Sequence, residues 1–237
     1  MRASAVLRVQ NEGNCPPLSE EVSVTYAPVL LVLAGVAGAG LSLLADLAIK
    51  AWLPRLGGMP PLWARLTTAA ITALLFVLFA WRFGISPELP AFLLLAVLAV
   101  QLSRVDIALH LLPNPLVLGL LVAGLALFAA SAALSSDWGG LLRGAAGGAV
   151  LFAGYLILGL ISPRGIGMGD VKLAAPLGVY LGYLGWKQVF YGGLLGFVLG
   201  GLLTVLLLRL GRGNTPKETP HGPPMFAAAI GTLLLLP

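Results

Sequence analysis

The stretch PLVLGLLVAGLALFAASAAL, residues 115–134, decides the fold of this chain. It contains no charged residue, and it has the length of about 20 residues that a helix needs to cross the hydrocarbon core of a bilayer. A helix is required there because the bilayer holds no water to pair with exposed backbone N–H and C=O groups. The stretch is therefore predicted to be a transmembrane helix.

Seven further apolar windows follow the same pattern, with charged or Gly/Pro-rich breaks between them. Two windows, 172–184 and 225–236, are short for complete crossings, so we expect about eight membrane helices, or seven if one of the two does not cross. The first window is longer than the apolar core of a signal peptide and is predicted to be retained. The seven windows are residues 27–49, 66–83, 89–112, 140–161, 172–184, 189–208 and 225–236.

The composition of the 237-residue chain agrees with a membrane bundle. Hydrophobic residues make up 59% of it and charged residues only 10%, against roughly 25% charged residues in a soluble domain. Many of the 31 glycines stand in small-residue runs, which let helices approach closely in lipid. We predict an all-α fold, a polytopic transmembrane helical bundle, with a polar N-terminal tail over residues 1–26 and a single transmembrane domain over residues 27–237.

The lysines and arginines give the chain a net charge of +5. They are scattered through short connections rather than clustered, which argues against a nucleic-acid surface. If all eight windows cross, nine of these residues fall on one side and five on the other, and the positive-inside rule places the nine in the cytoplasm and the N-terminal tail outside. The nine are Lys50, Arg55, Arg65, Arg104, Arg164, Lys172, Arg209, Arg212 and Lys217.

Cysteine and histidine are too few to suggest a metal centre. Cys15 is the only cysteine, which excludes a disulfide within the chain, and it is predicted to be inert. His110 and His221 are the only histidines and have no companion cysteines. We therefore predict no metal site, and we expect His110 to pack or pair locally.

Three of the nine acidic residues lie outside the tails and connections, namely Asp46, Asp106 and Asp170. Asp46 precedes Lys50 by one helical turn, near the end of the first predicted span. An i,i+4 ion pair can satisfy the aspartate there. A structural role is therefore predicted for Asp46.

Asp106 lies inside a helix that should stop just before Pro113. With a rise of 1.5 Å per residue, the side chain lies about 9 Å from that end. An ionisable group at such depth is costly and is a functional candidate. The structural alternative is an ion pair with Arg104 or His110, and the sequence leaves the two interpretations evenly balanced.

Asp170 ends the glycine-rich stretch GIGMGD, residues 165–170, which opens a predicted helix. Glycines let another chain approach closely, and the free N–H groups of a helix N-terminus favour a carboxylate. The alternative is an ordinary helix-capping aspartate. Nucleotide binding is not indicated, because neither a Walker Lys-Ser/Thr pair nor a Rossmann strand accompanies the glycines.

Both aspartates lie on the predicted cytoplasmic side, so bundle packing could bring them together. Two close carboxylates share a proton, which lets one act as a base toward water and the other as an acid toward a carbonyl oxygen. Two such groups are what an aspartic peptidase requires. We expect the helix N-terminus to favour the ionised form of Asp170 and burial to favour the protonated form of Asp106.

Three segments of the chain resemble the prepilin peptidases, the bacterial type IV leader peptidases of the GxGD aspartic class. The first is Asp106 followed seven residues later by Pro113-Asn114-Pro115-Leu116, and the second is Gly167-Met168-Gly169-Asp170-Val171-Lys172-Leu173. The third is Pro220-His221-Gly222-Pro223-Pro224-Met225-Phe226, in which His221 replaces the usual Phe. The resemblance covers the chain from about Asp106 to the C-terminus.

The resemblance implies a membrane-embedded aspartic endopeptidase of the bacterial inner membrane, with its active site facing the cytoplasm. It implies that residues 27–237 form the peptidase domain and that the substrates are prepilins or pseudopilins, cleaved at the membrane border after a glycine that precedes their hydrophobic helix. No cofactor is required for that cleavage. By resemblance, the catalytic residues are Asp106 and Asp170, supported by Gly167, Gly169, Lys172, Pro113 and Asn114, with Lys172 helping to position Asp170 or the substrate.

Many prepilin peptidases also methylate the new N-terminus with S-adenosylmethionine and carry a cysteine-rich module between their first two helices. Residues 50–65 of this chain are short and contain no cysteine. The chain therefore resembles the compact members, which leaves methyl transfer open.

Two other functions compete with a prepilin peptidase. Another GxGD intramembrane protease would share the two aspartates, but the Pro-Ala-Leu motif of those enzymes is absent near the last helix. A multi-pass transporter would use Asp106 to bind a proton or cation and Asp170 to cap a helix. Transport would not need the Asp106 and Asp170 motifs together, whereas the peptidases do.

Overall fold

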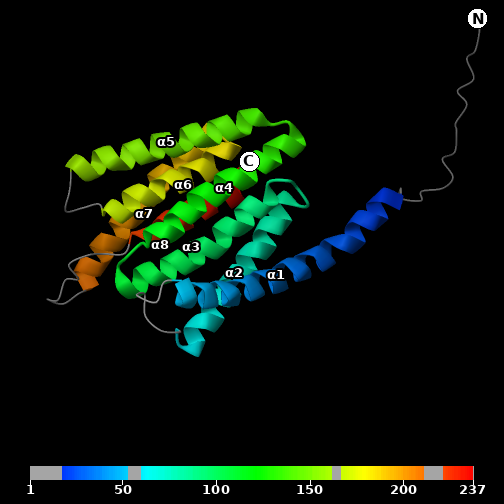
Figure 1. Cartoon of the computed structure of the whole chain (residues 1–237), viewed down its shortest axis with the longest axis horizontal. Coiled ribbons are helices and arrows are strands. Elements are labelled where there is room, and N and C mark those ends of the chain that lie inside the picture. Colours follow the sequence, from blue (N-terminus) through cyan, green and yellow to red (C-terminus); the bar gives the residue numbers. More distant parts are fainter. Residues whose placement is uncertain (1–17, 53–59, 162–166, 211–220, 237) are drawn as a thin grey trace, which may run out of the picture.

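Eight helices make up the described part of the chain, which comprises residues 18–52, 60–161, 167–210 and 221–236 of a computed structural model (Figure 1). The prediction of an all-helical bundle is confirmed, and each of the eight apolar windows corresponds to a helix of its own. The helices are α1 (Leu18–Trp52), α2 (Leu62–Phe83), α3 (Leu89–Leu109), α4 (Asn114–Ser135), α5 (Trp138–Ile161), α6 (Met168–Leu184), α7 (Trp186–Leu210) and α8 (Gly222–Leu235).

Six of these helices are long and apolar enough to cross a membrane, and the protein is a multi-pass membrane protein. They are α2, α3, α4, α5, α7 and the part of α1 from Pro28 to Ala51. Helix α6 has 17 residues and α8 has 14, so these two are shorter than the rest. The crossing of α6 and α8 stays a prediction.

Most helix ends differ from the predicted windows by a few residues, and the start of α1 and the end of α3 bear on the predictions made above. Helix α1 begins at Leu18, inside the stretch predicted as a polar tail. Helix α3 ends at Leu109, because His110 adopts a left-handed backbone conformation with φ 51° and ψ 38°. Histidine tolerates that conformation better than most residues. Asp106 therefore lies in the last turn of α3, closer to its end than the predicted 9 Å.

Helix α6 forms the centre of the bundle and packs against α4, α5, α7 and α8. Its contact with α5 is the most extensive and depends on glycine. A Cβ atom on Gly147 of α5 would lie 2.6 Å from the carbonyl oxygen of Gly178 on α6, and one on Gly144 would lie 3.1 Å from the carbonyl oxygen of Val179. Because the two backbones touch directly, this contact confirms the expectation that small residues bring helices together.

The end of α6 that lies away from Asp170 is held by polar and aromatic contacts. Arg143 of α5 donates to the carbonyl oxygens of Gly182 and Tyr183, at 3.1 and 2.8 Å, and so satisfies carbonyls that end a helix without partners. Phe128 of α4 stacks on the Tyr183 ring with their centroids 4.1 Å apart. Helix α6 is therefore anchored at that end, and its N-terminal end projects to the opposite side of the bundle.

Asp46 does not depend on Lys50, contrary to the sequence prediction. Its side chain is fully buried and forms an ion pair with Arg104 of α3, and the Nε atom of Arg65 lies 3.7 Å from its other oxygen. Local spacing suggested a partner on the same helix, but packing supplies two partners from α2 and α3. This ion cluster joins α1 to the helix that carries Asp106.

Removing the Asp46 carboxylate should destabilise the fold much more than removing Lys50. Asp46→Ala leaves two partly buried guanidinium groups without their counter-ion, and breaking a buried ion pair in this way typically costs about 3–5 kcal/mol. Lys50→Ala removes an exposed side chain and should change stability by less than about 0.5 kcal/mol. Thermal unfolding in detergent checks both variants, and an equal loss in the two would contradict the assigned partners.

Candidate active site

Asp106 is buried, with 5% of its surface exposed, and it accepts a hydrogen bond from a distant part of the chain. The N–H of Gly222, the first residue of α8, donates to its Oδ2 at 2.9 Å. A Cβ on Gly222 would lie only 2.8 Å from this oxygen, so a glycine is needed for the approach. Arg104, a proposed partner of Asp106, pairs with Asp46 instead.

Asp170 lies in the first turn of α6 and is 7% exposed. Its Oδ2 accepts a hydrogen bond at 3.2 Å from the N–H of Gly167, the residue that caps the helix. The side chain therefore does cap its own helix, as the structural alternative proposed. A Cβ on Gly169 would lie 3.3 Å from the Leu112 side chain, so that both glycines of the GxGD segment lie against neighbours they fit closely.

The structure brings the three sequence motifs to one place. Leu112, from the loop between α3 and α4, lies against Gly169, and it is also 3.5 Å from where a Cβ on Gly222 would be. Asp106 and Asp170 are close enough to interact electrostatically. Residues far apart in the sequence thus converge around the Leu112 side chain, which lies close to the first turns of both α6 and α8.

The environment of Asp170 favours its protonated form, which is the reverse of the sequence expectation. Burial and then the nearby charge of Asp106 raise the pKa of Asp170 to about 7, and the hydrogen bond from Gly167 opposes them only in part. The expectation failed because it weighed the helix N-terminus without the loss of water around the carboxyl group. Near neutral pH, Asp170 can therefore hold or release a proton.

Two supporting residues also meet at this site. The ammonium group of Lys172 donates to the Oδ1 of Asn114 at 3.1 Å, on the exposed side of the site. Pro113 immediately precedes α4, and its carbonyl oxygen accepts the first hydrogen bonds of that helix. Lys172 therefore ties the start of α6 to the start of α4, and its hydrogen bond goes to Asn114 rather than to Asp170.

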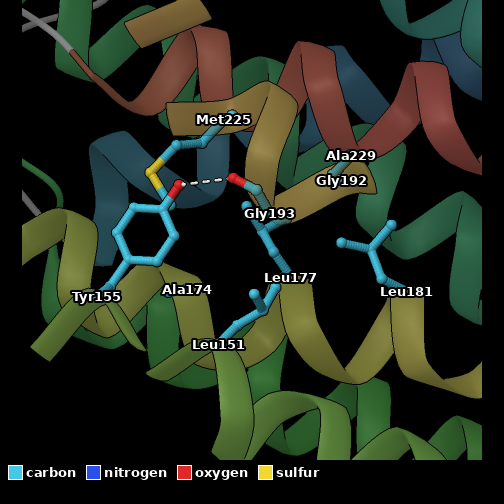
Figure 2. A pocket seen from close by; sticks show the side chains of 10 residues that line it. Leu151, Tyr155, Ala174, Leu177, Leu181, Gly192, Gly193, Met225 and Ala229 are labelled. Carbon is cyan, nitrogen blue, oxygen red and sulfur yellow. Dashed lines mark hydrogen bonds between the residues drawn. The ribbon is translucent and has the colours of Figure 1, made fainter. Parts of the chain in front are cut away.

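A small cavity lies among α5, α6, α7 and α8 (Figure 2). Its volume of about 10 Å³ leaves room for no more than about one water molecule. The Tyr155 hydroxyl points across it toward the carbonyl oxygen of Gly193, 3.5 Å away, and Tyr155 is also within electrostatic range of Asp170. Sequence reasoning missed Tyr155, because a tyrosine in an apolar helix resembles an ordinary core residue.

Among the described residues, no three His, Cys, Asp or Glu side chains come together as a metal-binding group. His110 and His221 lie within electrostatic range of Asp106. The site as described therefore consists of two buried carboxyl groups, the glycine N–H groups bonded to them and neighbouring histidines.

The sequence of residues 91–205 matches the type IV leader peptidase family. This match contains both Asp106 and Asp170. The chain belongs to the type IV leader peptidase family. The family assignment agrees with the resemblance seen in the three motifs, although the third motif lies beyond the matched residues.

Curated relatives of this family member are bacterial prepilin leader peptidase/N-methyltransferases. The chain is 34% identical over 161 residues to that of Stutzerimonas stutzeri, a match covering 66% of this chain and 53% of the relative. It is 35% identical over 167 residues to that of Pseudomonas aeruginosa, covering 70% and 55%, and 32% identical over 161 residues to that of Bacillus subtilis, covering 68% and 61%. The chain thus spans a little over half the length of these relatives, and no solved structure matches it.

The raised pKa of Asp170 makes a prediction for the stability of this family member. Between about pH 4 and 7 the unfolded chain releases the Asp170 proton and the folded chain keeps it, so this group's stabilising contribution is full below pH 4 and is lost as the pH rises to 7. Asp170→Asn carries no charge at this position. At pH 8 its free energy of unfolding should therefore exceed that of the wild type by a few kcal/mol at most, and it should unfold at a higher temperature. Thermal unfolding in detergent at pH 8 and pH 5 should show the advantage shrinking toward pH 5, and a variant less stable at pH 8 would contradict the assignment.

Proposed function

We propose that this protein is an aspartic endopeptidase that removes the leader of type IV prepilins or pseudopilins. The observation that carries the proposal is the convergence of Asp106 and Asp170, both buried and interacting electrostatically, at the N-termini of α8 and α6. The family assignment and the printed names of the relatives support the same activity. A transporter would not require two carboxyl groups held in this way by glycine N–H groups.

In the proposed reaction, Asp170 holds the proton that the two carboxyl groups share, and ionised Asp106 acts as the base. Asp106 removes a proton from a water molecule, whose oxygen attacks the carbonyl carbon of the scissile peptide bond. Asp170 donates its proton to the carbonyl oxygen, which gives a neutral tetrahedral intermediate. The intermediate returns a proton to Asp170 as the C–N bond breaks, and Asp106 gives its proton to the leaving amine. Both carboxyl groups then regain their starting states.

The division of roles depends on what surrounds each carboxyl group. The pKa of about 7 suits Asp170 to donate and accept a proton near neutral pH. Asp106 accepts the shorter backbone hydrogen bond, 2.9 Å against 3.2 Å, and an ionised carboxylate is the stronger acceptor. At Asp170 this assignment differs from the one expected from the sequence, because burial outweighs the helix N-terminus there.

We place the site at the cytoplasmic border of the bacterial inner membrane. The Asp106 end of α3 also carries Arg104, whose ion cluster includes Arg65, and the exposed Lys172 lies beside the site. Basic residues concentrated at one end of the spans favour the cytoplasmic side. A prepilin would therefore be cleaved where its hydrophobic helix meets the cytoplasm.

Methyl transfer is a separate question, although the relatives are also named N-methyltransferases. The proposed peptide cleavage uses no cofactor, whereas methyl transfer would use S-adenosylmethionine. We assign none of the described residues to binding it. The mass of a processed pilin would report methylation directly, because one methyl group adds about 14 Da.

Co-expression with candidate prepilins in a bacterial host that lacks its own leader peptidase tests the proposed function. Intact mass should show that the pilin loses its leader after the glycine that precedes its hydrophobic helix. A prepilin with leucine in place of that glycine is the matched substrate control and should keep its leader. Cleavage within the apolar helix would instead favour a different intramembrane protease, and retention of every leader would contradict the proposal.

A further inference from the structure

The Gly222 N–H reaches Asp106 across 116 positions of sequence, so something must hold the start of α8 in place. The residue before it, His221, is half-buried and caps α8, with its carbonyl oxygen accepting the N–H of Met225 at 3.3 Å. These backbone contacts orient α8 but do not fix it to a neighbouring helix. Helix α8 also packs against α7, α3 and α6, and the side chain of His221 adds a polar contact to α7 at the very start of α8.

The imidazole of His221 lies on α7, against Gly200 and Thr204. Its Nε2 atom is 3.4 Å from the Oγ1 of Thr204, and its Nδ1 atom lies 2.7 Å from where a Cβ on Gly200 would be. A larger residue at position 200 would displace the ring. The ring is therefore fitted to α7 by both shape and a hydrogen bond.

Thr204 contacts the backbone of its own helix as well as His221. Its Oγ1 atom lies 2.9 Å from the carbonyl oxygen of Gly200, one turn earlier on α7. The hydrogen bond between Oγ1 and the Nε2 atom of His221 can run in either direction, and it needs the Thr204 hydroxyl in both cases. Burial lowers the pKa of His221 below its ordinary value, which agrees with a neutral ring at pH 7.

From these contacts we infer that His221 and Thr204 are positioning residues for the active site, and that their hydrogen bond holds the Gly222 N–H on Asp106. The expected effect on kcat rests on the proposed function. The expected effect on the position of the Gly222 N–H does not depend on it. Asp106, Gly222, His221 and Thr204 form one continuous path from α3 through α8 to α7. Loss of the bond at α7 should therefore loosen the Gly222 N–H at the other end.

Thr204→Val keeps the shape of the side chain and removes the hydroxyl, and Thr204→Ser keeps the hydroxyl. In Thr204→Val, amide hydrogen exchange of residues 221–226 in detergent should be about five to ten times faster than in the wild type, because Gly222 leaves Asp106 more often. The kcat for leader removal should fall at least about tenfold with KM unchanged, because a displaced catalytic group slows chemistry rather than binding. Thr204→Ser should restore both values.

Three outcomes separate the inference from the proposed function. If Thr204→Val shows amide exchange and kcat within twofold of the wild type, the inference is overturned. Cleavage of the prepilin by the wild type would still support the proposed function. Equal defects in the serine and valine variants would also overturn it, because the hydroxyl would then be irrelevant. If the wild type cleaves no prepilin, the proposed function fails, and the exchange of residues 221–226 still decides whether Thr204 holds Gly222 in place.

Discussion

Asp106→Asn and Asp170→Asn should each lower the rate of leader removal by about 10²-fold to 10⁴-fold, the usual contribution of a general acid or base. Asparagine can still accept the hydrogen bond from Gly222 or Gly167, so the backbone around each position should be kept. It cannot take a proton from water or give one to a carbonyl oxygen. The measurement is the initial rate of leader loss with purified protein in detergent, followed by the mass of the pilin.

Glu88→Gln is the matched control for both variants. Glu88 stands just before α3, at the opposite end from Asp106, and the substitution makes the same chemical change from carboxylate to amide. Its rate should equal that of the wild type. If either asparagine variant folds normally and cleaves at a rate within threefold of wild type, the two-aspartate reaction is wrong.

Gly147→Leu should be the most damaging single change to the fold. Even a Cβ at this position would lie 2.6 Å from the Gly178 carbonyl oxygen and 2.9 Å from the Gly182 Cα, and backbone atoms cannot turn aside as a side chain can. Overpacking typically costs 1–3 kcal/mol, and we expect at least about 3 kcal/mol where the obstacle is another backbone. The expected result is little monodisperse protein after detergent extraction.

Gly154→Leu is the control on the same helix. A Cβ at Gly154 meets no atom within 4 Å, so leucine there should leave the yield and the unfolding temperature near those of the wild type. Equal damage from the two substitutions would mean that added bulk in α5, rather than its contact with α6, causes the loss. Because α6 carries Asp170, any folded Gly147→Leu protein should also cleave slowly.

The sequence allowed the helices to be predicted and the two aspartates to be singled out, because both show in local patterns, and the catalytic role of the aspartates stays a prediction. Long apolar windows determine helices in a bilayer, and residues 115–134 needed no tertiary information. The partner of Asp46 could not be predicted, because Arg65 and Arg104 reach it only after three helices pack. The end of α3 was also missed, since the left-handed conformation of His110 leaves no mark in hydrophobicity.

The protonation of Asp170 shows a second limit of local reasoning. Its position at a helix N-terminus can be read from the glycines, and this position alone favours the charged form. The burial that outweighs it comes from helices far away in the sequence, and so does the charge of Asp106. The role of His221 was missed for the same reason, because Gly200 and Thr204 lie on another helix.

The two short helices, α6 and α8, have a consequence for the membrane around the site. Arg143 and Arg82 hold their far ends beside α5 and α2, so the missing length falls at the end where Asp106 and Asp170 lie. With 17 and 14 residues they extend about 25 and 21 Å, against about 30 Å of hydrocarbon. Both carboxyl groups therefore lie where the short helices begin, with Asp170 in the first turn of α6 and Asp106 on the first N–H of α8. Under the proposed function, the level in the membrane at which these two helices begin, as much as the residues around the scissile bond, would determine which bond of a substrate is cut.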